Sequence, residues 1–385
     1  MSNYSTLNDH RPMVFDELRN TIYAQAIKEA VNKHSVVLDL GAGLGLHGMM
    51  AARAGAKKVY LVEPASILDI TRQLVSANHL SEQIECISGT IEAIQLPEKV
   101  DVIISVFTGN FLLTEDLLPS LFFARDKYLA PGGKLIPDRA TMNIVPVSAP
   151  EYYAEHIDCW NSGQNSNNRK THDSQDIVLE PVRKYAENTL LYENPDKRKA
   201  IFLSEPAELL EMDFMTATEA SCRNRTEVDI TEDGLCHGWL GWFRMRLGQN
   251  WLSTSPKEKQ THWRQAFLPL SSPIAVQQGK TLSFSLSRPE YGEWSWDIEY
   301  EGEKQRQSSF LSEPVTHTTL KKKSDQYKPG LSKYGLATQA ALSLFDKDKT
   351  TVEIVDYILA RNDSLFPTRL LAEQFVKSLI EKHSS

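Results

Sequence analysis

Residues 36–64 constrain the fold of this chain most strongly, because they place a glycine-rich turn between two apolar segments and end the second segment on an acid. Both segments, 36–40 and 59–62, are short and apolar, as expected for strands buried in a parallel sheet. The turn carries glycines that permit a tight bend and the close approach of a ligand, namely Gly41, Gly43 and Gly45. This layout predicts the first strand–turn–helix–strand unit of a nucleotide-type cofactor site.

The spacing of the glycines distinguishes between two classes of cofactor. The dinucleotide fingerprint G-x-G-x-x-G requires glycine at position 46, where this chain has Leu46. The pattern G-x-G-x-G without that glycine is the variant associated with S-adenosylmethionine (SAM). Glu63, at the end of the second strand, is placed to accept hydrogen bonds from both ribose hydroxyls. On the motif alone, an ordinary tight turn in an α/β sheet is the alternative.

The alternation of helices and strands continues after Glu63 and predicts a doubly wound α/β sheet. A helix is expected over residues 67–79, with further strands over residues 84–88 and 100–105. Ligands of such sheets bind beyond the carboxyl ends of the strands, so the segments that follow these strands should face one crevice. Glu92 lies just beyond the third strand and is placed to accept a hydrogen bond from an adenine amino group. A solvated loop acid is the alternative.

Length, composition and charge limit the classes of protein to be considered. A chain of 385 residues exceeds the ~250 to 300 at which single cores stop growing, so two or three domains are expected. No apolar run is long enough to span a bilayer, and the polar amino terminus lacks the layout of a signal peptide, which predicts a cytoplasmic protein. The net charge of −8 disfavours nucleic-acid binding and permits cationic substrates. Scattered cysteines without a C-x-x-C pair argue against a disulfide framework and a metal site: Cys86, Cys159, Cys222 and Cys236.

Two signatures far apart in the sequence resemble those of the protein arginine methyltransferase family. The first has the form H-x-x-M-L-x-D-x-x-R and reads here His10-Arg-Pro-Met13-Val-Phe-Asp16-Glu-Leu-Arg19. The second is the family's T-H-W loop, here Thr261-His262-Trp263. The resemblance covers most of residues 8–300. It implies a class I SAM-dependent methyltransferase with a Rossmann-like domain followed by a β-barrel substrate domain.

The resemblance assigns roles to residues of both signatures. Arg19 is implied to pair with the methionyl carboxylate of SAM, because a guanidinium donates two parallel hydrogen bonds to a carboxylate. His262 is implied to pair with Asp16, which would orient the imidazole and offer a route for the proton lost on methylation. Taken singly, a helix-surface arginine and a structural histidine are the alternatives. The cofactor-binding residues implied are His10, Met13, Arg19, Asp39, Gly41, Gly43, Gly45, Glu63 and Glu92, with Met13 beside the sulfonium.

The chain departs from the family at the loop that clamps the substrate. The family has S-E-W-M-G-Y followed by Y-E-S, whereas this chain has Ser105-Val106-Phe107-Thr108-Gly109-Asn110 followed by Thr114-Glu115-Asp116. Glu115 matches the second glutamate, but Val106 replaces the first, so a bound guanidinium would face one carboxylate. Losing a charge-assisted hydrogen bond, typically worth ~1.5 to 3 kcal/mol, would lower binding or rate tenfold to a hundredfold. The implied wall of the acceptor pocket consists of Val106, Phe107, Thr108, Asn110 and Trp263.

These residues favour methylation of a nitrogen on a peptide, a protein or a natural-product intermediate. SAM is already a reactive methyl donor, so the acceptor chiefly needs an aligned lone pair. A neutral imidazole or an amine of low pKa has one, whereas a guanidinium must first be polarised by a carboxylate. The candidate catalytic residues are Glu115, His262 and Asp16. Two alternatives are arginine methylation with Glu115 alone and a SAM-binding scaffold or regulatory subunit without catalysis.

After a SAM-binding domain over residues 1–139, the pattern changes to short alternating strands, which predicts an all-β, barrel-like domain over residues 140–312. A Pro-Gly-Gly turn at residues 131–133 is expected just before the last strand of the first domain. Tryptophans are expected to fill the barrel interior: Trp239, Trp242, Trp294 and Trp296. A polar segment within residues 156–195 lies where the family inserts its dimerisation arm. A homodimer is inferred, and a plain loop is the alternative.

Residues 313–385 have no counterpart in the family core and predict a separate helical unit. Helices are expected from Ser332 to Phe345, from a capping box at residues 350–353, and from Thr368. Spaced apolar residues would form a small core: Leu336, Ala340, Leu344, Ile354 and Ile358. A faint similarity to winged-helix modules that deliver peptides to modifying enzymes competes with a simple helical appendage.

Overall fold

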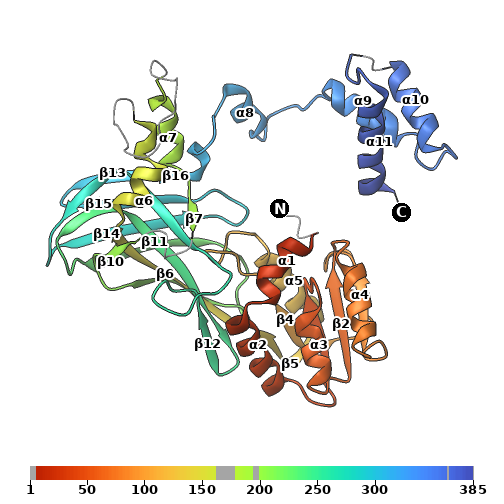
Figure 1. Ribbon diagram of the computed structural model, residues 1–385, viewed down its shortest axis with the longest axis horizontal. Coiled ribbons are helices and arrows are strands. Elements are labelled where there is room, and N and C mark those ends of the chain that lie inside the picture. Colours follow the sequence, from red (N-terminus) through yellow and green to blue (C-terminus); the bar gives the residue numbers. More distant parts are fainter. Residues whose placement is uncertain (1–5, 162–177, 194–198, 362–363, 385) are drawn as a thin grey trace. The chain divides into compact units, whose positions relative to one another are not determined.

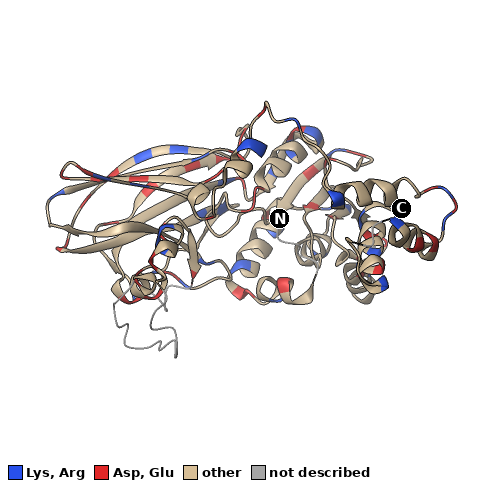
Figure 2. Ribbon diagram, turned by 90° about the horizontal axis from the view of Figure 1, so that it is seen from above, with Lys and Arg blue, Asp and Glu red and all other residues tan. Residues whose placement is uncertain are grey.

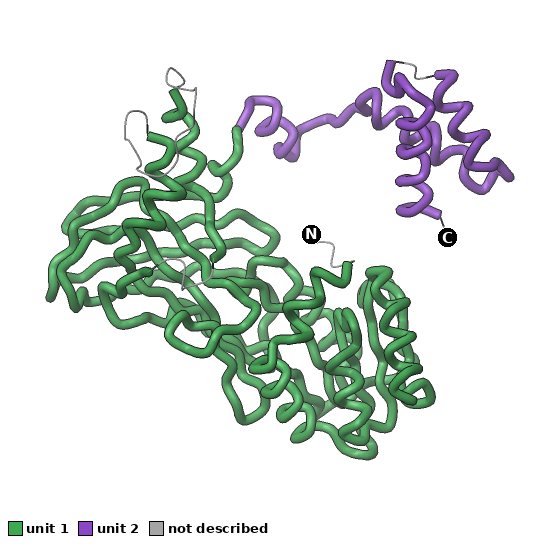
Figure 3. Tube along the Cα trace, in the orientation of Figure 1, with its two compact units in different colours: residues 1–314 green, residues 315–385 purple. Residues whose placement is uncertain are grey.

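The computed structural model describes residues 6–161, 178–193, 199–361 and 364–384. The chain divides into two compact units, Met1–Pro314 and Val315–Ser385 (Figure 3). In the first unit, a parallel-sheet domain and a β-domain share one hydrophobic core. Tyr23 illustrates the connection, because its hydroxyl donates to the carbonyl of Ser105 at 2.8 Å and lies 3.9 Å from the sulfur of Met245 in the β-domain.

The first domain contains a five-stranded parallel sheet in the order β3-β2-β1-β4-β5 (Figure 1). Its strands are β1 (Val36–Leu40), β2 (Lys58–Glu63), β3 (Ile84–Ser88), β4 (Val100–Ser105) and β5 (Leu129–Ile136). Its helices are α1 (Leu7–Val14), α2 (Glu17–Ala30), α3 (Leu46–Arg53), α4 (Leu68–Ala77) and α5 (Leu118–Tyr128). The strand order reverses between β1 and β4, which is the switch point where such sheets bind ligands. The predicted doubly wound sheet is confirmed.

Strand β5 differs from the expected turn followed by a strand. Its register on β4 shifts, because Val100 pairs with Leu129 whereas Val102 pairs with Lys134. The Pro-Gly-Gly segment therefore forms an irregularity inside the strand, where Gly132 has a φ of 78°. Proline lacks the N–H that a regular ladder needs, and glycine accepts positive φ, so this segment bulges without ending the strand.

The β-domain is antiparallel. One sheet of seven strands has the order β7-β13-β11-β6-β8, with β12 added to β11 and β9 to β6, and a four-stranded sheet has the order β10-β14-β15-β16. The strands are β6 (Arg139–Ser148), β7 (Leu191–Glu193), β8 (Ile201–Phe202), β9 (Ala207–Asp213), β10 (Cys222–Asp229), β11 (Gly234–Leu247), β12 (Asn250–Ser253), β13 (Gln265–Val276), β14 (Thr281–Arg288), β15 (Ser295–Tyr300) and β16 (Glu303–Ser308). The four tryptophans expected inside it are all buried.

Short helices accompany the β-domain: α6 (Pro150–His156), η1 (Asp158–Trp160), η2 (Glu180–Val182), α7 (Arg183–Ala186) and η4 (Ser309–Leu311). Arg183 ties this region together, since it donates to the carbonyls of Ile157 and Ser271 and pairs with Asp158. Most of the polar segment expected to form the dimerisation arm, residues 162–177, lies outside the described residues. The arm therefore stays a prediction.

The second unit contains α8 (His317–Lys322), α9 (Lys333–Leu342), α10 (Thr351–Arg361) and α11 (Arg369–His383). All three expected helix starts are confirmed by capping hydrogen bonds, from Gly335 N to Ser332, between Thr350 and Glu353, and from Leu371 N to Thr368. The core prediction was wrong for Leu336, which is 53% exposed. Ala337 and Ala341 are buried instead, because α9 turns the neighbouring face inward. The described residues of this unit form helices without strands, so they contain no wing.

Acidic and basic residues are interspersed over the molecule (Figure 2). The four cysteines are free, and Cys222 and Cys236 are buried. Within the described part of the chain, no helix is long and apolar enough to cross a membrane. Nor do three or more His, Cys, Asp or Glu side chains gather there in a way that could hold a metal ion.

Candidate active site

The glycine turn after β1 lies beside the end of β4, since Leu40 pairs with Ser105. Gly41, Gly43 and Gly45 have φ values of 68°, 53° and 73°, a region in which side chains are strained. A Cβ at Gly43 would also lie 2.8 Å from the ring of His10, and one at Gly41 would collide with the ring of Phe107. The turn therefore needs glycine both for its backbone conformation and for the two rings that lie on it.

Two buried carboxylates shape this turn from the sheet side. Glu63 accepts hydrogen bonds from Gly43 N and Ala65 N, each at 2.9 Å and each on a different oxygen. Each carboxylate oxygen has a second lone pair, so Glu63 can hold the turn and still accept from a ligand hydroxyl. Asp39 accepts from Gly48 N at 2.7 Å. Burial raises the pKa of Asp39 to about 7, and the charge of Glu63 adds to this effect.

Arg19, in the first turn of α2, is a buried cation with 4% of its surface exposed. Its Nε donates to Asn20 Oδ1 at 3.1 Å, and it forms no ion pair with any residue that the structure describes. Burial lowers the pKa of this guanidinium, because the charged form loses hydration. A buried cation without a carboxylate partner is costly, and a ligand carboxylate would compensate that cost. His10 of helix α1 is also buried, whereas Met13 is only half-buried.

Asp16 and His262 are paired, as predicted. Asp16 is the N-cap of α2, where one oxygen accepts from Arg19 N at 3.0 Å. Its other oxygen accepts from His262 N and lies 2.8 Å from His262 Nδ1. Burial opposes ionisation of Asp16, but the hydrogen bonds from His262 and Arg19 hold its pKa below the ordinary value. Burial lowers the pKa of His262, so at neutral pH an imidazole that donates from Nδ1 faces a carboxylate.

The T-H-W loop is fastened to the segment that follows β4. The indole N–H of Trp263 donates to the carbonyl of Thr108, and Arg264 N donates to Asn110 Oδ1, both at 2.8 Å. Thr108 and Trp263 are buried at 3% and 5% exposure. These contacts join the T-H-W loop to the loop that carries Val106. Thr108 and Trp263 are therefore buried residues that support the predicted wall of the acceptor pocket.

Glu115 lies in the same loop as Val106. Gly109 and Leu112 exchange backbone hydrogen bonds at 3.1 Å, which folds the loop back on itself. As a result, a Cβ at Gly109 would lie 3.1 Å from Cγ of Glu115. Val106 and Phe107 are half-buried and pack against the core. Position 106 of this loop thus carries an apolar side chain.

Glu92 is less closely tied to this site than the other predicted residues. It is exposed and accepts a hydrogen bond from the hydroxyl of Ser120 in α5 at 2.5 Å. The predicted contact with adenine stays a prediction.

His47, in α3, is a buried residue that belongs to none of the sequence motifs. Its ring stacks on Tyr23, with ring centroids 4.3 Å apart, and its Nε2 has no hydrogen-bond partner among the described residues. Burial, with a smaller contribution from the charge of Arg19, lowers its pKa well below the ordinary value. The sequence signal for His47 is a polar residue directly after Leu46, near the start of the helix. An apolar residue facing the sheet would be expected at that position.

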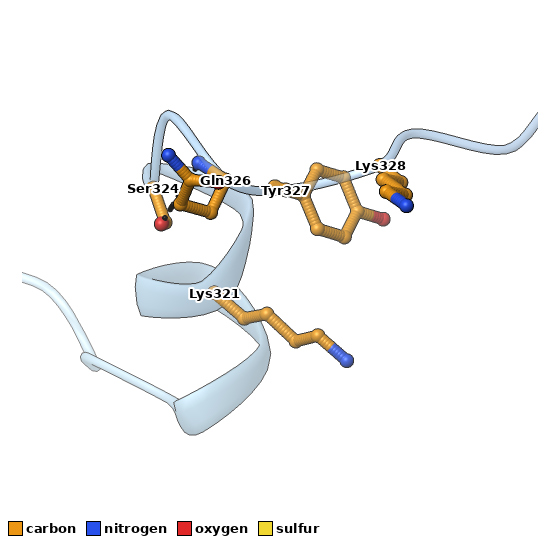
Figure 4. A pocket seen from close by; sticks show the side chains of 5 residues that line it. All are labelled: Lys321, Ser324, Gln326, Tyr327 and Lys328. Atoms are coloured by element: carbon orange, nitrogen blue, oxygen red, sulfur yellow. Dashed lines mark hydrogen bonds between the residues drawn. The ribbon is translucent and has the colours of Figure 1, made fainter.

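A separate hollow lies in the linker of the second unit (Figure 4). It is lined by Lys321, Ser324, Gln326, Tyr327 and Lys328. All of these except the half-buried Tyr327 are exposed, and none belongs to the site around the glycine turn. This exposed, mostly polar lining differs from the enclosed, mostly apolar pockets in which small molecules usually bind.

Comparison with known proteins agrees with this geometry. Residues 37–133 match the family described as "Methyltransferase domain", and residues 138–305 match the "Arginine methyltransferase oligomerization subdomain". The chain is 32% identical over 290 residues to protein arginine N-methyltransferase 1 of Dictyostelium discoideum, covering 73% of this chain and 81% of the relative. It is 34% identical over 297 residues to protein arginine N-methyltransferase 6 of Danio rerio, covering 74% and 82%.

Solved structures give the same result. The Trypanosoma brucei PRMT1 enzyme-prozyme heterotetrameric complex with AdoHcy matches with a TM-score of 0.71 and 28% identity, over 80% of this chain and 99% of that chain. Arabidopsis thaliana protein arginine methyltransferase 10 matches with a TM-score of 0.69 and 29% identity, over the same shares of 80% and 99%.

SAM is the cofactor that this site fits. The glycines with positive φ would let the cofactor lie close to the backbone of the turn. Glu63 retains lone pairs that could accept from the ribose hydroxyls, and Arg19 is a buried cation suited to the carboxylate of SAM. The fold, the site and the relatives agree: this chain is a class I SAM-dependent methyltransferase and belongs to the protein arginine N-methyltransferase family.

Proposed function

We propose that this enzyme methylates a nitrogen of a peptide, a protein or a natural-product intermediate, with Glu115 as the single carboxylate of its clamp. The proposal rests on Val106, which packs against the core and which the sequence resemblance aligns with the first clamp glutamate. A valine neither hydrogen-bonds nor carries charge, so position 106 offers no partner to a second edge of a guanidinium. A nitrogen with a lone pair of its own, such as a neutral imidazole or an amine of low pKa, suits this wall better.

In this proposal each residue of the site has its own role. SAM supplies an electrophilic methyl group on a sulfonium. Arg19 and Glu63 hold and orient the cofactor, while Glu115 accepts a hydrogen bond from the acceptor and aims its lone pair. The proton lost from the acceptor passes to Glu115 or to Nε2 of His262, whose Nδ1 faces the Asp16 carboxylate at 2.8 Å. Alignment of the acceptor is the main contribution of the protein to the rate.

Arginine methylation with Glu115 alone is the second candidate. It is favoured by the names of the relatives, which are protein arginine N-methyltransferases. A non-catalytic partner role is suggested by the enzyme-prozyme complex among the structural neighbours. Against it stands the Asp16–His262 pair, since a subunit that only bound SAM would not need a route for the proton of an acceptor.

A homodimer is part of the proposal. Its support is the match of residues 138–305 to an oligomerization subdomain. Residues 156–195 would supply the arm.

Mass spectrometry with methyl-deuterated SAM tests the proposal. The enzyme is incubated with extract from a strain that lacks its gene, and proteins, peptides and small molecules are analysed separately. Glu115→Gln, which keeps the size of the side chain and removes its charge, is the matched control and should lose the label. Label on a nitrogen other than arginine supports the proposal, label on arginine establishes the second candidate, and tight SAM binding without label establishes the non-catalytic role.

A further inference from the structure

The residue that follows Glu115 is anchored to the β-domain by a buried arginine. Oδ1 of Asp116 accepts two hydrogen bonds, one from Nη2 of Arg288 and one from the backbone N–H of Tyr291 at 3.1 Å. Arg288 ends strand β14, and 2% of its side chain is exposed, against 29% for Asp116. The two partners are 172 residues apart in the sequence, so the pair fastens the clamp loop to a distant strand.

The same loop is held on the other side of Glu115. The hydroxyl of Thr114 lies 3.3 Å from the hydroxyl of Tyr192 in β7 and accepts from Phe111 N at 3.2 Å. The ring of Phe111 stacks on that of Trp294, with centroids 5.4 Å apart. The guanidinium of Arg288 lies 5.5 Å from the centroid of the same Trp294 ring. Arg288 therefore contacts both Asp116 and Trp294, the ring on which Phe111 of the loop stacks.

The conformation of Asp116 makes its anchor consequential. Its φ is 56°, a left-handed region that residues other than glycine enter at a cost. Tertiary contacts must maintain such a conformation, and here the contacts are those to Arg288 and Tyr291. Nε and Nη1 of Arg288 have no hydrogen-bond partner among the described residues. The guanidinium forms its ion pair with Asp116 through Nη2. Removing either side leaves a buried or strained group uncompensated.

We propose that Arg288 is a positioning residue for Glu115, acting through Asp116. Asp116 stands where the family pattern has serine, so this ion pair belongs to the same altered loop as Val106. A clamp with one carboxylate depends on the placement of that carboxylate more than a clamp with two. The functional part of this inference rests on the proposed role of Glu115.

Hydrogen–deuterium exchange of the full-length enzyme saturated with S-adenosylhomocysteine tests the anchor directly. Arg288→Met keeps the length of the side chain, and Asp116→Asn keeps its shape, while each removes a charge. Each variant should exchange the amides of residues 109–116 about tenfold faster, and the double variant no faster than either one. Arg225→Met is the control, because Arg225 pairs with Glu227 and Glu299 in the same four-stranded sheet and should leave the loop unchanged. Unchanged exchange in Arg288→Met overturns the proposal.

Methyl transfer from tritiated SAM into the extract tests the consequence. Arg288→Met and Asp116→Asn should lower kcat about tenfold to a hundredfold while the KM for SAM stays the same, because the cofactor residues are untouched. Arg288→Lys keeps the positive charge but lacks the planar guanidinium with its several donors, so it should recover part of the rate. Faster exchange with an unchanged kcat overturns the positioning role. If the wild type itself transfers no label, the proposed function fails, and the exchange experiment still decides whether Arg288 holds the loop.

Discussion

Nδ1 of His262 lies 2.8 Å from Oδ2 of Asp16, although the two residues are 246 positions apart. Asp16 is the N-cap of helix α2, and His262 belongs to the T-H-W loop of the β-domain. The backbone N–H of His262 donates to the same oxygen. One carboxylate thus connects the start of helix α2 to the T-H-W loop.

Replacing His262 with glutamine should lower kcat about tenfold to a hundredfold, because the proton route is lost while the backbone bond to Asp16 stays. Because burial depresses the pKa of His262, wild-type activity should hold from pH 8 to 7 and fall as the imidazole protonates below its ordinary value of about 6.5. Rates under saturating SAM check both points. His34→Gln, at an exposed site, is the control. An unchanged pH profile in His262→Gln would remove the proposed role.

Replacing Arg19 with methionine should weaken SAM binding roughly tenfold to a hundredfold, which corresponds to the loss of a charge-assisted bond worth about 1.5 to 3 kcal/mol. Without SAM, the variant should melt at the same or a higher temperature, because the buried guanidinium lacks an ion-pair partner among the described residues. Thermal melts with and without SAM measure both effects. A loss of apo stability together with unchanged affinity would show a structural role instead.

Introducing glutamate at Val106 should lower the native reaction at least about tenfold and increase methylation of arginine peptides, if the acceptor is a nitrogen other than arginine. The new carboxylate would also lower the melting temperature, since Val106 is half-buried against the core. Val106→Gln is the matched control, with equal size and no charge. A native product of methylarginine that Val106→Glu merely forms faster would contradict the proposed acceptor.

Replacing His47 with leucine should flatten the dependence of stability on pH. The folded-state pKa of His47 is depressed by burial, so below pH 6.5 the unfolded chain takes up a proton that the folded chain excludes. Wild-type stability is therefore lost as the pH falls through 6.5, by up to ~1.4 kcal/mol per pH unit more than in the variant. Urea unfolding from pH 7.5 to 5 measures the difference. Parallel curves for the two proteins would mean that His47 is hydrated or protonated in the fold.

Removing residues 315–385 should leave the SAM Kd within about twofold of the full-length value. The reason is that every proposed cofactor residue lies in the first compact unit. Calorimetry of residues 1–314 against the full chain measures this. Weaker binding by the shortened chain would place part of the cofactor site in the second unit.

Local patterns were sufficient for much of the fold. The strands at 36–40 and 100–105 could be predicted because largely apolar runs and flanking turns are typical of buried parallel strands. The predicted strand at 84–88 lies at the edge of the sheet and is only partly buried. The helix starts at Ser332, Thr350 and Thr368 followed from caps that act within one turn. Each of these features depends on residues that are neighbours in the chain.

Features that depend on packing were harder to predict. Leu336 fits an apolar spacing, but the structure buries Ala337 and Ala341, because a helix can present either of two adjacent faces to its neighbours. The burial of His47, whose Nε2 finds no hydrogen-bond partner in the part of the chain that the structure describes, also depends on what surrounds α3. The sequence near His47 does not specify those surroundings.

By itself, the sequence determined the glycine turn, the acid that ends β2 and the two family signatures, because chemistry and spacing within short segments define them. The tertiary structure decided which distant residues meet: His262 with Asp16, Trp263 with Thr108, and Arg288 with Asp116. Hydrogen bonds are directional and act over about 3 Å, so such pairs form only after the two domains have packed into one core.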